Sequence, residues 1–214
     1  MRGILTFGLA ALCAVPAFAA SDDFNRAELG KKWNAVNGTL SISNNQLVGS
    51  NNALGTFKYS RTATTVSVVV SLNSLDTHYG AVAIGDMATG NNAFVKIQNP
   101  AGGDLFDRGA FYDANNHNNG TLFPLSPQVP SPATLTASLC GTVVTMTIKS
   151  SVGTQKYAHD YGSEAKSFGS GTGLGTFGPV TLDNYMSKVG RKCALDADTV
   201  MIGRPSLADP TTAK

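Results

Sequence analysis

Two tyrosines and a run of asparagines supply aromatic faces and amide groups that could bind a polar ligand. Residues 113–120 read DANNHNNG, and Tyr112 comes directly before them. Amide groups both donate and accept hydrogen bonds, as sugar hydroxyls do, and aromatic rings offer apolar faces for packing. The candidate ligand-binding residues are therefore Tyr79, Tyr112, Asn115, Asn116, His117 and Asn118. The alternative is a solvated loop tip whose asparagines serve turn conformations.

The acidic residues show no pattern that would serve glycoside hydrolysis. A retaining mechanism needs two carboxyl groups about 5 Å apart, one as acid and one as nucleophile. The chain has only two glutamates, Glu28 and Glu164, and they are far apart in the sequence. Asp104 and Asp107 lie three residues apart, in a setting more typical of a turn. We therefore assign no catalytic residue, and whether the chain is an enzyme stays open.

The first twenty residues have the features of a secretory signal peptide. Arg2 is followed by an apolar run at residues 4–15 and by the small-x-small sequence of residues 17–19. This order predicts export, to the extracellular space or the periplasm. Two cysteines remain after cleavage, Cys140 and Cys193. In an oxidising compartment they are expected to form a disulfide, with two buried free thiols as the alternative.

Composition argues against two classes of partner. Only 14% of residues are charged and the formal net charge is +2, without a run of lysines or arginines that would indicate nucleic-acid binding. No second apolar segment follows the leader, so we expect no membrane insertion. The length suits one core, and we expect a monomeric domain over residues 21–195 and a C-terminal strand or tail over residues 196–214.

The elements that must position these side chains are strands. In residues 93–98, Ala93, Val95 and Ile97 alternate with Phe94, Lys96 and Gln98, and residues 64–73 and 142–149 alternate in the same way. Alternation of this kind is typical of antiparallel sheets with one face on a core. We count about ten to twelve short strands and no helix, which predicts an all-β, antiparallel two-sheet β-sandwich of the jelly-roll type.

Turn residues mark where these strands should end. Asn44-Asn45 and Asn37-Gly38 can each take the positive φ of a tight hairpin. Four prolines between residues 122 and 133 predict a loop there, because proline does not fit a central strand. Residues 199–202 could add a strand within the tail.

Both ends of the exported chain resemble a known group of domains. DDFNRAELGKKW at residues 22–33, followed by NGTLSISNNQLVGS at residues 37–50, is similar to the opening of secreted concanavalin A-like (laminin G-like) domains. GLGTFGPVTLDNYMS at residues 173–187 is similar to their closing pair of strands, with Asp183-Asn184-Tyr185 in the second strand. The resemblance implies a jelly-roll sandwich in which the first and last strands are neighbours.

The resemblance also implies possible sites. Relatives often hold a structural calcium between sheet and loops, which would place Asp23 and Asp183 as ligands here, since calcium prefers oxygen donors. The alternative is that Asp183 caps a bulge or pairs with Arg26. The hydrolase branch of the group uses a Glu-x-Asp-x-x-Glu strand, which this sequence lacks.

Taken together, these observations predict a secreted, non-catalytic binding module. Its expected partner is a carbohydrate or cell-surface glycan, recognised through a concave sheet and the neighbouring asparagine and aromatic loops. It would require no cofactor, and a structural calcium is the one possible ion. The alternatives are a polysaccharide-degrading hydrolase or lyase with an atypical site, and a structural or protein-interaction domain of the cell surface.

Overall fold

The computed structural model describes residues 20–59, 63–72, 78–100, 102–113, 116–178, 180–189 and 195–203, with the backbone alone for residues 51, 113 and 116–119. The strands are β1 (Ala20–Asp22), β2 (Trp33–Ser43), β3 (Gln46–Phe57), β4 (Thr65–Leu72), β5 (His78–Asp86), β6 (Asn91–Asn99), β7 (Leu105–Asp113), β8 (Asn116–Pro130), β9 (Ala133–Cys140), β10 (Val143–Ser150), β11 (Gly153–Asp160), β12 (Thr172–Phe177), β13 (Val180–Lys188) and β14 (Val200–Met201). A short 3₁₀ helix, η1 (Gly162–Ser167), precedes β12.

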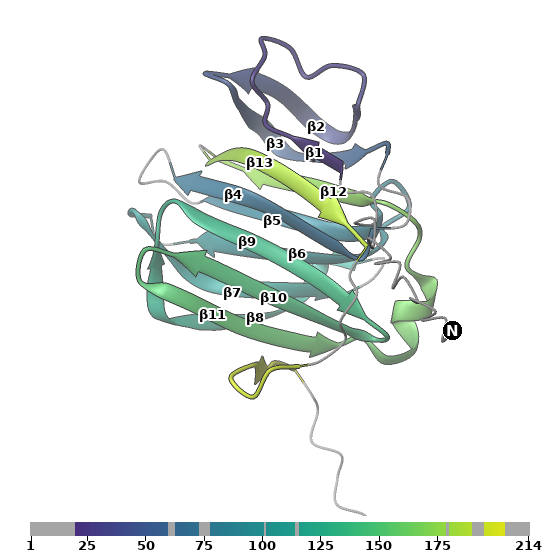
Figure 1. Cartoon of the computed structure of the whole chain (residues 1–214), viewed down its shortest axis with the longest axis vertical. Coiled ribbons are helices and arrows are strands. Elements are labelled where there is room, and N and C mark those ends of the chain that lie inside the picture. Colours follow the sequence, from purple (N-terminus) through teal and green to yellow (C-terminus); the bar gives the residue numbers. More distant parts are fainter. Residues whose placement is uncertain are drawn as a thin grey trace, which may run out of the picture.

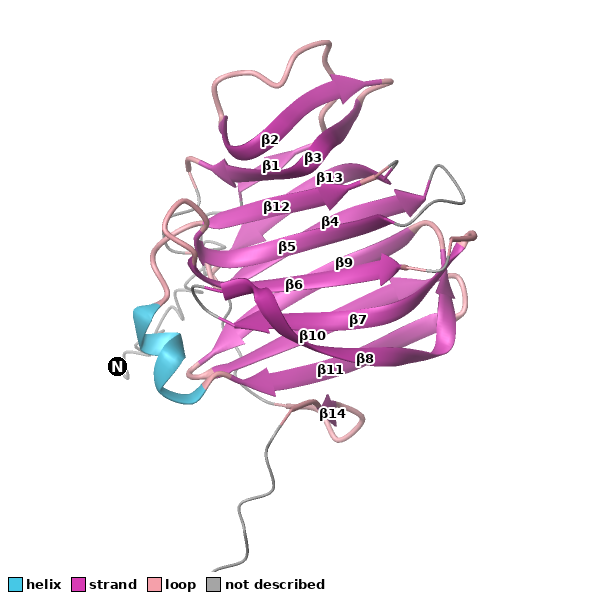
Figure 2. Cartoon of the chain, turned by 180° about the vertical axis from the view of Figure 1, so that it is seen from behind, coloured by secondary structure: helices cyan, strands magenta, loops and turns pink. Residues whose placement is uncertain are grey.

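These strands form two stacked layers. The front sheet has the order β11-β10-β9-β4-β13, and the back sheet has the order β3-β12-β5-β6-β7-β8. The front sheet faces the viewer in Figure 1 and the back sheet in Figure 2. The layers are joined through β3, whose first residues pair with β13 and whose last residues pair with β12. The predicted antiparallel two-sheet sandwich is confirmed; only the short β14 joins its neighbour, β11, in parallel.

The core lies between the two sheets and follows the predicted alternation. Val66, Val68 and Val70 of β4 are fully buried, and β6 buries Val95 and Ile97 from the opposite sheet. Each such side chain contributes about 1.5–3 kcal/mol through burial. The sheets approach closely at Gly80, where an added Cβ would lie 2.3 Å from Cγ1 of Val70.

The two ends of the domain lie side by side, as the sequence predicted. Strand β1 pairs with β13 from Ala20↔Ser187 to Asp22↔Tyr185. Phe24, directly after β1, is completely buried. The start of the domain is therefore held on its last long strand.

Two turn predictions had different outcomes. Asn44 and Asn45 have φ values of 51° and 59° and connect β2 to β3, which confirms the predicted hairpin. The prediction for Asn37-Gly38 was wrong, because these residues lie inside β2 where the register with β3 shifts. A bulge uses the positive φ of Gly38, 60°, as readily as a hairpin does.

The proline-rich segment is a strand and not the predicted loop. Pro124, Pro127 and Pro130 belong to β8, which pairs with β7 and lies at the end of the back sheet. Proline is tolerated at a sheet edge, where one side of the strand needs no hydrogen-bond donors. The register between β7 and β8 also shifts at Phe106 and Arg108, which lie opposite this segment.

Several expectations concern residues outside the described part of the chain. The leader, residues 1–19, and Cys193 lie there, so the signal peptide and the Cys140–Cys193 disulfide stay predictions. Within the tail, β14 confirms a strand in the expected segment. Among the described residues, no helix has the length and apolar character needed to cross a membrane.

Candidate functional site: a groove on the back sheet

The outer face of the back sheet carries a groove of about 410 Å³, lined by Asn37, Asn52, Leu54, Tyr79, Phe94, Lys96 and Tyr112. On this face of the sheet, residues that are cross-strand partners form rows that run across the strands. The middle row contains Gly175 of β12, Ala81 of β5, Lys96 of β6 and Ala110 of β7. Apart from the lysine, these residues are small and fully buried, so they lie beneath the side chains that line the groove.

Aromatic residues of the two flanking rows form the walls. On one side, Tyr79 stacks against Phe177 with ring centroids 5.9 Å apart. On the other side, Phe94 and Tyr112 are cross-strand partners whose rings meet edge to face at 5.9 Å. Tyr79 also contacts Phe94 edge to face at 6.3 Å. These contacts hold the rings in place before any ligand arrives.

Lys96 lies between the two tyrosines. Its Nζ is 4.7 Å from the centroid of the Tyr79 ring and 4.6 Å from that of Tyr112. Such cation–π contacts stabilise the ammonium. Burial nevertheless lowers the pKa of Lys96 to about 8, because the charged form has lost part of its water. Burial likewise raises the pKa of Tyr79 to about 12, with a smaller effect of Tyr112, and raises the pKa of Tyr112.

Two asparagines close one end of the groove. The Tyr79 hydroxyl donates to Oδ1 of Asn52 at 3.4 Å, and Nδ2 of Asn37 donates to the Asn52 carbonyl at 3.1 Å. Asn52 has a φ of 53°, a conformation that asparagine accepts more readily than most residues. Both asparagines are exposed and leave amide groups open to a ligand.

The structure brings together some of the residues chosen from the sequence. Tyr79 and Tyr112, which lie on different strands, both line the groove and both flank Lys96. Asn115 lies outside the described residues. Asn116, His117 and Asn118 are described only as backbone of β8, so the expected asparagine loop is largely a strand.

Sequence reasoning missed most of the groove. Phe94, Lys96 and Gln98 were recognised as one face of a strand, but they were not assigned to a site. Arg108 is exposed and is the cross-strand partner of Gln98, so it lies on the same outer face. The available signal was an aromatic, a cation and an amide at alternate positions of one strand.

The chemistry of the groove is that of recognition by packing, hydrogen bonding and positive charge. The middle row and the two flanking rows contain no aspartate or glutamate at the described positions from β12 to β7. Glu28 lies in the loop before β2 and Glu164 in η1, and both are exposed. Neither belongs to the groove lining.

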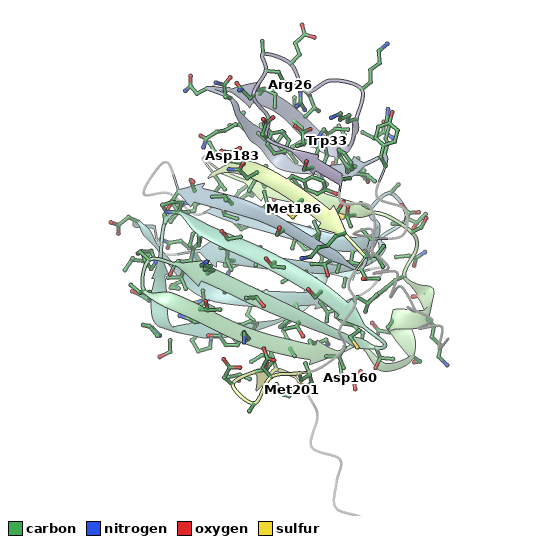
Figure 3. All side chains as sticks on the ribbon, in the orientation of Figure 1. Arg26, Trp33, Asp160, Asp183, Met186 and Met201 are labelled. Carbon is green, nitrogen blue, oxygen red and sulfur yellow. The ribbon has the colours of Figure 1, made fainter. Side chains whose placement is uncertain are left out.

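A second polar cluster holds the first strand in place. Oδ2 of Asp22 accepts hydrogen bonds from Nη2 of Arg26 and Nε1 of Trp33, both at 2.7 Å, and Oδ1 accepts from the Phe24 N–H at 3.0 Å. We call Asp22, Phe24, Arg26 and Trp33 the clasp. Burial raises the pKa of Asp22, but the hydrogen bonds from Arg26, Trp33 and Phe24 outweigh it and hold that pKa below its ordinary value. Figure 3 shows Arg26 and Trp33 at the end of the sandwich formed by β1, β2 and β3.

The clasp bears on the predicted calcium site. Asp23 Oδ1 accepts the Asn25 N–H at 3.2 Å, and Asp183 Oδ1 accepts the Asn184 N–H at 2.7 Å, beside the bulge in β13. Asp183 thus caps the bulge, which was one of the alternatives to a role as calcium ligand. The Arg26 guanidinium bonds to Asp22 and to the carbonyls of Glu28 and Leu29, the last two at 2.8 and 2.7 Å, and so supplies the cation among the oxygens around the clasp. No group of three or more metal-ligating side chains occurs among the described residues. Asp23 and Asp183 alone do not supply the six to eight oxygens that calcium prefers, and the calcium site stays a prediction.

No protein-family model matches the sequence. No curated protein matches it at a significant level.

Solved structures do share the architecture. A prokaryotic β-1,3-1,4-glucanase (lichenase) from a mouse hindgut metagenome superposes with a TM-score of 0.54 at 7% identity, covering 79% of this chain and 98% of that one. Lectin II from Ulex europaeus gives a TM-score of 0.51 at 8% identity, covering 81% and 99%. The CBM2 module of the evolved Dit protein of Lactobacillus casei BL23 phage J-1 gives 0.52 at 12% identity, covering 84% and 100%. The chain therefore has the concanavalin A-like fold that the sequence resemblance implied.

Proposed function

We propose that this chain is an exported, monomeric, non-catalytic module that binds carbohydrate along the groove of the back sheet. The observation that carries the proposal is a groove lined by the rings of Tyr79, Phe94 and Tyr112, with the amides of Asn37 and Asn52 at one end. A sugar ring needs an apolar surface for its C–H face and polar groups at its edge for its hydroxyls. The tyrosine hydroxyls and the amides of Asn37 and Asn52 supply the second requirement.

The groove suits an oligosaccharide better than a single sugar. From Asn37 of β2 the middle row continues through Leu54 of β3 to Leu122 of β8. The groove lining follows this row from Asn37 to Lys96, which is four inter-strand spacings of about 4.8 Å or roughly 19 Å. Leu122, at the far end of the row, lies beyond the groove lining and is 46% exposed.

Two further features support a binding module of this kind. The fold is shared with a lectin, a carbohydrate-binding module and glucanases, so the same architecture serves glycan recognition elsewhere. The leader predicted from the sequence would deliver the chain to a compartment where polysaccharides are present.

The experiment is a glycan array followed by affinity electrophoresis in gels that contain the polysaccharides that score. Tyr79→Ala and Tyr112→Ala should each weaken binding by about tenfold or more, since each removes a wall of the groove. Tyr59→Ala is the matched control, because Tyr59 is 69% exposed and does not line the groove. Wild-type protein that binds no glycan, or equal losses in all three variants, would refute the proposal. Reducing-sugar and unsaturated-product assays on the same glycans test the enzymatic alternatives.

A further inference from the structure

We infer that the groove selects glycans that carry acid groups, with Lys96 as the main contact for the carboxylate or sulfate and Arg108 as a second contact. This inference rests on the proposed function, because it names the class of glycan that the same groove takes. It starts from the placement of one cation.

Lys96 is half-buried in the groove lining between Tyr79 and Tyr112, and no described carboxylate forms an ion pair with it. Lysine is almost never buried without a partner, because loss of hydration is costly. Here the partners are the faces of Tyr79 and Tyr112, which attract the charge but accept none of its N–H bonds in the way an oxygen does. The ammonium therefore keeps donors for a ligand that enters the groove.

The surroundings add a second positive charge. Lys96 pairs with Ala110 and Gln98 pairs with Arg108, so Lys96 and Arg108 are diagonal neighbours on one face. Diagonal Cβ atoms in a sheet are about 7–8 Å apart, within reach of two long side chains. Arg108 is exposed, and its guanidinium can bind a carboxylate or sulfate with two parallel hydrogen bonds. An acid group on the sugar could thus contact the positive charges of Lys96 on β6 and Arg108 on β7.

A neutral glycan would gain less from this arrangement. Covering Lys96 with an uncharged sugar would remove its remaining water without supplying a counter-charge. An anionic group would replace that water by a charge-assisted bond in a site that is already shielded. The groove therefore favours an acidic glycan over a neutral one of the same shape.

The test compares ligands that differ only in charge. Polygalacturonate and its methyl-esterified form share one backbone, as do dextran sulfate and dextran, and the two pairs separate carboxylate from sulfate. Alginate and hyaluronan extend the panel to other acidic backbones. We expect at least one acidic polysaccharide to bind tenfold or more tightly than its neutral counterpart or than dextran.

The variants assign that preference to the groove. Lys96→Met should weaken acidic binding by tenfold or more, Lys96→Arg should retain most of it, and Arg108→Gln should weaken it a few-fold. Lys149→Met is the matched control, since Lys149 is exposed on β10 of the front sheet. The fluorescence of Trp33 and thermal melting show whether each variant is folded.

A pH series gives an independent readout. The groups facing Lys96 are Tyr79, Tyr112 and Arg108; the tyrosines stay neutral because burial raises the pKa of each. Lys96 loses its proton as pH rises through about 8, so the Kd for an acidic glycan should rise between pH 7 and 9.5. Lys96→Arg should bind with a nearly constant Kd over the same range.

The possible results distinguish a failure of the acidic preference from a failure of glycan binding itself. Equal affinity for charged and neutral partners, with binding still lost in Tyr79→Ala, would overturn the acidic preference and leave glycan binding intact. A preference that Lys96→Met and Lys149→Met reduce equally would also overturn it. Binding to no polysaccharide at all would remove both.

Discussion

Replacement of Asp22 by asparagine tests whether the clasp holds the first strand to the sandwich. Asp22 is 4% exposed, and its two oxygens accept from the Phe24 N–H, Trp33 Nε1 and Arg26. Asparagine keeps one oxygen, so it can still accept from Phe24. Its NH₂ group, however, would point at Trp33 and Arg26, which are both donors.

The cost follows from which of these donors remain buried. Trp33 is 4% exposed, so its indole N–H would lose its acceptor without gaining water, at about 1–3 kcal/mol. The Arg26 side chain is 29% exposed and can recover part of its hydration, so the broken pair costs about 1 kcal/mol. The total is about 2–4 kcal/mol, which for a domain of this size lowers Tm by about 4–16 °C.

The measurement is chemical denaturation followed by the fluorescence of Trp33, the single tryptophan of the chain. Asp23→Asn is the matched control, because Asp23 is exposed and its one local turn bond can be made equally well by asparagine. Its effect should stay within about 0.5 kcal/mol. If Asp22→Asn unfolds at the same denaturant concentration as Asp23→Asn, the clasp does not stabilise the fold and the reasoning is wrong.

Four more outcomes are expected. Because the pKa of Asp22 is lowered in the folded state, the stabilisation by its carboxylate is complete above about pH 4 and is lost as pH falls through that lowered pKa. In urea titrations at several pH values, the free energy of unfolding should therefore fall less steeply with acid in Asp22→Asn than in the wild type. Gly80→Ala should cost about 1–3 kcal/mol by overpacking Val70, and the double variant with Val70→Ala should cost less than the two single costs added together. If Cys140 and Cys193 form the expected disulfide, mass spectrometry after alkylation should find neither labelled without reductant, and reduction should cost about 4 kcal/mol of stability. A calcium chelator should leave Tm unchanged, whereas a lowered Tm would restore the calcium hypothesis.

The layers of the sandwich could be predicted from the sequence because strand patterning is local. The alternation of Ala93, Val95 and Ile97 identifies the core face of β6 without knowledge of any other strand. Asn44-Asn45 identifies a hairpin because two adjacent asparagines tolerate positive φ. Such signals depend on residues within a few positions of one another.

The groove could not be predicted in the same way, because it depends on register between strands. Tyr79, Lys96 and Tyr112 meet only because β5 pairs with β6 at Tyr79↔Gln98 and β6 pairs with β7 at Phe94↔Tyr112. A slip of one residue in either pairing would turn the tyrosine to the opposite face. The sequence shows which residues share a face of one strand, but not which residues lie beside them.

The calcium site stays a prediction, and its ligands could not be chosen from the sequence for a related reason. The sequence places Asp22 and Asp23 side by side, and its pattern does not say which one faces inward. In the structure Asp22 is the buried member of the pair, and it forms an ion pair with Arg26, four residues later. The more exposed Asp23 was the residue assigned as a ligand.

The alternation of β6 divides binding and stability between its two faces. Val95 and Ile97 supply apolar burial between the sheets, whereas Phe94 and Lys96 line the groove on the opposite face. The residue beneath these side chains must stay small, since a Cβ on Gly175 would lie 2.9 Å from Cζ of Phe94 and 3.0 Å from Cδ2 of Leu54. Glycine and alanine stabilise strands poorly, so the groove can exist only because the opposite face of the same strands is densely packed. The half-buried lysine adds a further cost to the empty groove, and an anionic ligand is the kind of partner that would offset it.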